Sequence, residues 1–271
     1  MKLSNIFSKR NRVLLRELVI TDFKLRYQGS VLGYVWSLLK PLMLFAIMFV
    51  VFVHFLRFGQ GIEHFAVSLL LGIVLWTFFV EATNQGMQAI VNRGDLIRKI
   101  NLPKYIIVIS GTISALINLL LNLVVVLVFM VFDGVHFGWS VLLFPLTLLV
   151  IYTFSLGIAF FLSAAYVKFR DISHIWDVVL QALFYATPII YPLQMVMSFN
   201  IVAAQVLMLS PVAALFQTAR AELVGYDYVI TSADIFNNPF LVALPYIIVV
   251  IVVIIAAVYF KKSQSKFAER V

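Results

Sequence analysis

The chain has 271 residues, of which 63% are hydrophobic and 12% charged, with a formal net charge of +8 and no cysteine. Soluble domains average roughly 45–50% apolar and about 25% charged residues, so this composition excludes an ordinary soluble protein and indicates an integral membrane protein. The lack of cysteine excludes disulfides and thiolate chemistry, and positive charge in a membrane protein is typical of cytoplasmic loops and anionic-lipid attraction rather than of nucleic-acid binding.

Residues 1–28 are too highly charged to cross a bilayer, and they place Leu14, Leu18 and Leu25 on one helical stripe. We expect an N-terminal amphipathic helix at the membrane interface. Other apolar residues interrupt its charged side, which leaves a plain cytoplasmic helix as the alternative. The first 30 residues offer neither the short apolar core nor the cleavage site of a signal peptide, so the first span is expected to act as an uncleaved signal.

Six segments are apolar enough to span a membrane, which takes about 20 mostly apolar residues. They cover residues 31–56, 65–89, 105–131, 140–165, 176–197 and 241–260. The sequence therefore predicts one all-α transmembrane permease domain. Its parts are the interfacial helix (1–28), spans one to five (29–197), an external re-entrant region (198–240), span six (241–260) and a cytoplasmic tail (261–271).

The 42 uncharged residues between Asp177 and Arg220 are long enough for two crossings, so a seven-span arrangement is an alternative. Positive charges favour six spans. A six-span arrangement places four groups of cations in the cytoplasm: those of the N-terminal segment, of the loops at 92–104 and 166–175, and of the tail. A seventh span would put the tail outside. Ser210-Pro211 divides residues 201–223 into two pieces too short to span, which predicts a re-entrant helical pair in the outer leaflet.

The sequence lacks the motifs of phosphate-binding loops, zinc proteases and serine hydrolases, and its four histidines are scattered. We therefore predict no catalytic residue and no metal site. A membrane protein without an energy-coupling motif is a passive channel, a gradient-driven transporter, or one subunit of a machine whose motor lies on another chain.

The loop at residues 92–104 (NRGDLIRKINLPK) favours the last of these classes. Asp95 can cap a short helix that Pro103 ends, and this helix would carry an apolar face rimmed by cations, which suits a groove on a partner. The predicted partner-binding residues are Arg93, Asp95, Leu96, Ile97, Arg98, Lys99 and Ile100. The alternative is a solvated loop whose cations only set the topology.

Several short motifs occur in order along nearly the whole chain. They are LRYQGSVLGYVWSLLKP (25–41), NLP (101–103), YVKFRD (166–171), TPIIYP (187–192), SP (210–211) and FAE (267–269). Together they resemble the type-2 ATP-binding-cassette permeases, above all the exporters of lipid-linked polysaccharides such as O antigens, capsules and wall teichoic acids. Lys40 and Ser210 depart from the family pattern, which usually has Asn before each of these prolines.

The resemblance implies a six-span half-transporter that works as a homodimer with two copies of a separate ATPase subunit in a bacterial plasma membrane, with both termini cytoplasmic. ATP and Mg would be bound by that subunit, this chain would bind no cofactor, and the substrate would be a polyprenyl-linked polymer among membrane lipids, without nucleic acid. Two alternatives remain. A membrane-embedded transferase on lipid-linked sugars would need a cluster of acid, base or metal-binding groups, and a gradient-driven transporter would usually show inverted repeats.

Five residues inside the predicted spans are candidates for the substrate path. An intramembrane carboxylate is costly and usually functional, which selects Glu81. The fifth span carries Gln181, Phe184 and Tyr185 on one stripe, followed by Tyr191. Aromatic faces with nearby polar groups suit sugar rings, although aromatic residues also collect at membrane interfaces without a ligand.

Small polar residues recur every four positions in the third span, at Ser110, Ser114, Asn118 and Asn122. Hydroxyl and amide side chains at this spacing commonly join membrane helices, so we expect these residues to bind neighbouring helices rather than substrate.

Overall fold

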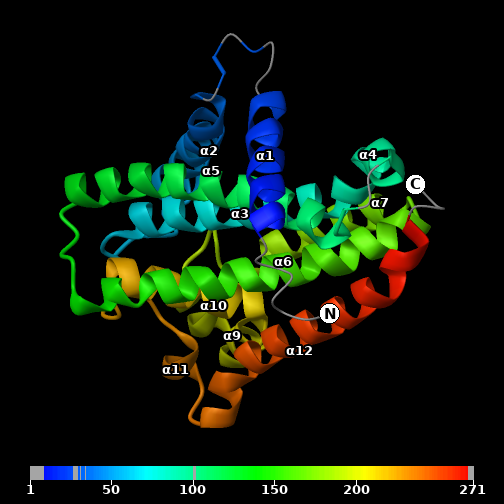
Figure 1. Ribbon diagram of the computed structural model, residues 1–271. Helices are drawn as coiled ribbons and strands as arrows, with labels where there is room; N and C mark the ends of the chain where they lie inside the picture. The colour runs from blue at the N-terminus through cyan, green and yellow to red at the C-terminus, as the bar shows by residue number, and fades with distance from the viewer. Residues whose placement is uncertain (1–8, 27–29, 31, 34, 100–101, 268–271) are drawn as a thin grey trace.

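The computed structural model shown in Figure 1 describes residues 9–26, 30, 32–33, 35–99 and 102–267. All regular secondary structure in these residues is helical. The predicted all-α class is therefore confirmed.

Five helical segments are long and apolar enough to cross a membrane, and a bent helical pair would make a sixth if it were counted as one span. The five are α2 with its π-helical continuation η2 (Val35–Met48 and Phe49–Phe55), α3 (Phe65–Asn92), α5 (Lys104–Phe132), α6 (Phe144–Lys168) and α12 (Pro239–Ser263). Their bounds agree with five of the six predicted spans to within a few residues.

Helix α3 forms the centre of the bundle and packs against α5, α6 and α10 (Pro211–Val224). In its most apolar window 78% of the residues are buried, against 11% for α2 and 17% for α12, which are therefore peripheral. Small residues allow the central helices to approach closely, since a Cβ added at Gly86 of α3 would collide with Ala159 of α6.

Helix α1 (Lys9–Arg26) packs across α5 (Figure 1). Leu14 and Leu18 pack on an apolar cluster below it, while Arg12 and Arg16 are exposed. The predicted two-faced helix is confirmed at these positions, and the side chain of Leu25 lies outside the described residues.

The predicted fifth span is not one continuous helix. Helix α7 (Ile172–Ala186) is followed by an irregular turn and then by α8 (Leu193–Phe199). Thr187 is extended, with φ −103° and ψ 132°, because the ring of the following Pro188 disfavours a helical conformation there. Fifteen residues rise about 22 Å, which is less than the roughly 30 Å hydrocarbon core of a bilayer. The prolines therefore end the helix inside the predicted span.

The predicted division at Ser210-Pro211 is confirmed. Helix α9 (Ile201–Met208) meets α10 at an angle of 95°. The two helices have 8 and 14 residues and rise about 12 and 21 Å, so neither is long enough to cross alone. Helix α10 is buried along almost its whole length between α3, α6 and α12. A short helix, α11 (Ser232–Ile235), then leads into α12.

Candidate functional site

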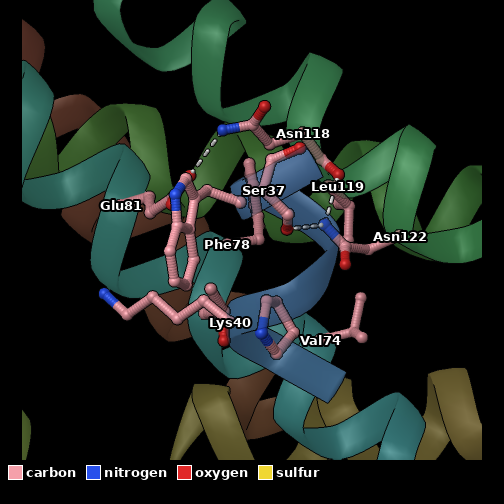
Figure 2. Close-up of a pocket in the computed structure, with 11 residues that line it drawn as sticks. Ser37, Lys40, Val74, Phe78, Glu81, Asn118, Leu119 and Asn122 are labelled. Carbon is pink, nitrogen blue, oxygen red and sulfur yellow. Dashed lines mark hydrogen bonds between the residues drawn. The ribbon is translucent and has the colours of Figure 1, made fainter. Parts of the chain in front are cut away.

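A cavity of about 220 Å³ lies between α2, α3 and α5 (Figure 2). Polar groups from all three helices line it, beside apolar side chains. The lining residues are Trp36, Ser37, Lys40, Pro41, Val74, Thr77, Phe78, Glu81, Asn118, Leu119 and Asn122. The predicted path residue Glu81 thus lies beside the polar stripe of α5, which the sequence had assigned to helix contacts.

Two asparagines of α5 bind the neighbouring helices across this cavity (Figure 2). The Nδ2 of Asn118 donates to Oε2 of Glu81 on α3 at 3.1 Å, and the Nδ2 of Asn122 donates to the carbonyl oxygen of Ser37 on α2, also at 3.1 Å. Both asparagines are buried. The predicted joining role of this stripe is therefore confirmed, and the same bonds fix the position of the Glu81 carboxylate.

The cavity combines a half-buried carboxylate, amide groups and the indole of Trp36, with Lys40 exposed beside them. A carboxylate accepts hydrogen bonds from hydroxyl groups, an amide can both accept and donate them, and an aromatic ring can pack on the apolar face of a sugar. Within the described part of the chain, no three His, Asp or Glu side chains gather as a metal site would require.

Helix α7 presents an exposed face that includes Gln181 and Tyr185, which lie one turn apart. Tyr185 is 61% exposed. Few residues of α7 contact α3 and α6, and Leu180 is the one buried residue in this helix. Two of the predicted path residues therefore share an open face.

Phe184 and Tyr191 do not share that face fully, which corrects the prediction. Phe184 is half-buried and packs on Trp76 of α3, with ring centroids 5.5 Å apart. Tyr191 is also half-buried, and its hydroxyl donates to the carbonyl oxygen of Tyr185 at 2.8 Å. The reason is that α7 meets α3 through the side that carries Phe184, while the turn after the helix folds Tyr191 back against it.

The predicted short helix in the loop at residues 92–104 is present as α4 (Gly94–Lys99), with Asp95 in its first turn and Arg98 and Lys99 in its last. Its orientation differs from the prediction. Ile97 is 6% exposed and belongs to an apolar cluster with Phe260 of α12, and Leu96 is half-buried against the same cluster.

The apolar side of α4 therefore faces the chain itself, and a partner would meet the exposed side chains of Asp95, Arg98 and Lys99. The predicted Ile100 lies outside the described residues.

Arg93, predicted to rim the partner surface, instead joins three elements of the chain. Its guanidinium pairs with Asp22 of α1 and donates to Oγ of Ser110 of α5 at 2.8 Å. Burial lowers the pKa of Arg93 below its ordinary value. Since Arg93 directly precedes α4, these bonds connect the position of α4 to α1 and α5.

The buried Arg220 of α10 binds the turn that follows α7. The guanidinium of Arg220 in α10 donates to the carbonyl oxygens of Pro188 and Ile189 and, at 2.9 Å, to Oε1 of Gln217. It packs directly on Gly72 of α3. Its position in a long apolar run was the only sequence signal for this role.

Comparison with known proteins places these elements in a wider group. Residues 13–223 match the family model described as ABC-2 type transporter. The O-antigen export system permease protein RfbA of Myxococcus xanthus is 31% identical over 223 residues, which cover 82% of this chain and 84% of that protein. Two proteins of the same description from Klebsiella pneumoniae are 26% and 25% identical over 179 residues, covering 65% of this chain and 67% of each relative.

Proposed function

The chain belongs to the ABC-2 type transporter family, and on that premise we propose that it exports a polyprenyl-linked polysaccharide as half of a homodimer with two separate ATPase subunits. Its role is that of the permease subunit of an ATP-binding-cassette polysaccharide exporter. The observation that carries this conclusion is the family match over residues 13–223, together with the likeness to O-antigen export permeases. ATP and Mg²⁺ would be bound by the partner subunit, and this chain would bind no cofactor.

We assign the docking of the ATPase subunit to α4. Its outer surface carries Asp95, Arg98 and Lys99, which are free to meet charges on a partner, while Ile97 anchors it to the bundle. Helix α4 lies between the end of α3 and the start of α5, and Arg93 joins it to α1. A movement of the ATPase would therefore be passed to two membrane helices and the N-terminal helix together.

We assign the polymer path to the open face of α7. A sugar polymer must thread through a continuous channel, and weak repeated contacts on aromatic rings serve this better than one tight site. Tyr185 and Gln181 would face their counterparts across a two-fold axis, which a homodimer provides. The cavity at Glu81 would then lie beside the channel as a second polar contact.

The proposed orientation places both termini, α4 and the loop at 166–175 in the cytoplasm of a bacterial cell, with the re-entrant pair near the outer surface of the plasma membrane. It rests on the distribution of cations, because positively charged loops remain inside. The transported polymer would be an O antigen, a capsule or a teichoic acid.

The test is reconstitution of the chain with its partner ATPase subunit. The chain alone should not hydrolyse ATP, and the complex should couple hydrolysis to movement of lipid-linked polymer into vesicles. Charge reversal at Arg98 and Lys99 together should uncouple the two, whereas reversal at the exposed Arg57, at the opposite end of the bundle, should not. ATP turnover by the chain alone, or coupled export by the Arg98→Glu, Lys99→Glu variant, would contradict the proposal.

A further inference from the structure

A groove of about 310 Å³ lies between α5, α6 and the peripheral helix α12, apart from the cavity at Glu81. Tyr105 and Ile109 of α5, Phe160 of α6, and Ala257 and Phe260 of α12 form its walls. These side chains make the lining almost entirely apolar. The groove is thus a slot for hydrocarbon rather than for a sugar or a free ion.

Two lysines from different helices stand at the end of this groove. Lys261 of α12 lines it directly, beside Gln264. The Nζ of Lys104, at the start of α5, donates to the carbonyl oxygen of Gln264 at 2.7 Å. An ammonium has three N–H donors, so Lys104 can bond to Gln264 and still donate to a ligand at the groove. No acidic side chain occurs among the groove's described lining residues.

The basic helix α1 adds to this charge. The Nδ2 of Asn11 donates to the hydroxyl of Tyr105, a wall residue of the groove, at 3.3 Å. The residues on either side of Asn11, Arg10 and Arg12, are exposed. Two lysines therefore stand at the end of the apolar slot, and the helix that contacts its wall through Asn11 carries further exposed cations.

We propose that this groove binds an anionic phospholipid, with one acyl chain between α5, α6 and α12 and the headgroup phosphate against Lys261 and Lys104. Each part of the site suits one part of such a lipid. The apolar walls would pack against the acyl chain, and the lysines would neutralise the phosphate. Basic pockets between membrane helices on the cytoplasmic side bind anionic headgroups for this reason. Free phosphate would leave the apolar walls uncovered, and a zwitterionic lipid would not neutralise the lysines.

The bound lipid would also support α4. Phe260 belongs to the same apolar cluster as Ile97 of α4, and Tyr105 and Phe160 pack against that cluster. An acyl chain in the groove would contact the rings that hold Ile97 in place. The site thus connects the lipid composition of the inner leaflet to the helix assigned above to ATPase docking.

The purified full chain, in neutral detergent, can be titrated with phosphatidylglycerol and with phosphatidylcholine, with lipid binding followed by native mass spectrometry and thermal unfolding. Phosphatidylglycerol should bind more tightly and raise the unfolding temperature. Lys261→Glu should weaken this binding roughly 5- to 30-fold, since each cation near the headgroup contributes about fivefold. Ala257→Trp, which fills the groove without changing charge, should also abolish it.

Two neighbours in α12 serve as matched controls. Lys262→Glu alters a lysine that lines a different pocket, and Val258→Trp adds an indole at an exposed position outside the groove. Both should bind phosphatidylglycerol as the unmodified chain does. All four positions are exposed, so the variants are expected to fold.

Four results would overturn the proposal. The first is equal stabilisation by the two phospholipids, and the second is an equal loss in Lys262→Glu and Lys261→Glu. The third is tighter binding of polyprenyl phosphate than of phosphatidylglycerol to the unmodified chain, with the polyprenyl phosphate binding lost in Ala257→Trp, which would assign the groove to the transported lipid. Inorganic phosphate at the same concentrations should have no effect, and stabilisation by phosphate alone would also contradict an acyl-chain site.

Discussion

Arg220→Met should release the turn between α7 and α8 from α10. The guanidinium of Arg220 is buried, and it donates to the carbonyl oxygens of Pro188 and Ile189 and to Gln217. Methionine fills similar space but donates nothing, so both buried carbonyls lose their bond to this side chain. An unsatisfied buried polar group costs about 1–3 kcal/mol, and two carbonyl oxygens lose a charged donor, so the substitution should cost about 3–5 kcal/mol in total.

A loss of about 3–5 kcal/mol corresponds to a fall of about 6–20 °C in unfolding temperature for a protein of this size. The assay is thermal unfolding of the purified chain in detergent. Arg57→Met is the matched control, because Arg57 is an exposed arginine and its replacement should change stability by less than about 0.5 kcal/mol. Lys in place of Arg220 should be intermediate, since a single ammonium cannot form the fork-shaped pair of bonds.

Equal unfolding temperatures for Arg220→Met and Arg57→Met would refute the reasoning. That result would mean that the carbonyl oxygens of the turn find other donors when the guanidinium is absent. Gly72→Ala gives an independent check, because its added Cβ would collide with the guanidinium while leaving every hydrogen-bonding group in the chain. Overpacking of this kind should cost about 1–3 kcal/mol.

Four further outcomes are expected. Ile97→Asp should destabilise the chain by about 3 kcal/mol or more, because it buries a carboxylate among apolar side chains; unfolding at the unmodified temperature would show that α4 turns outward. Asn118→Leu should cost about 0.6–1.7 kcal/mol in thermal unfolding, as other interhelical hydrogen bonds in membranes do. Tyr185→Ala should reduce polymer export while assembly and ATP turnover persist, and unchanged export would remove this ring from the path. Cysteines introduced at Lys262 and Asp227 should react with an impermeant reagent from opposite sides of the membrane, and outside labelling at position 262 would contradict the six-span orientation.

The sequence alone was sufficient for features that depend on local chemistry. The apolar spans follow from composition, since a helix in lipid needs about 20 apolar residues wherever its neighbours lie. A short helix forms in the predicted loop, with Asp95 in its first turn, and Ser210-Pro211 divides α9 from α10, because turn-forming residues and prolines act within a few residues of chain. The regular spacing of Asn118 and Asn122 likewise predicted their role in joining helices.

The directions of side chains were decided only by the tertiary structure. Ile97 and Phe184 point into the bundle, and Arg220 binds a turn about 30 residues earlier in the chain. In a soluble protein, an apolar stripe marks the buried side of a helix. In a membrane, the side that faces lipid is as apolar as the side that faces protein, so the hydrophobic pattern does not distinguish them. Only the packing of α4 on α12 and of α7 on α3 determines which residues a partner or a polymer can reach.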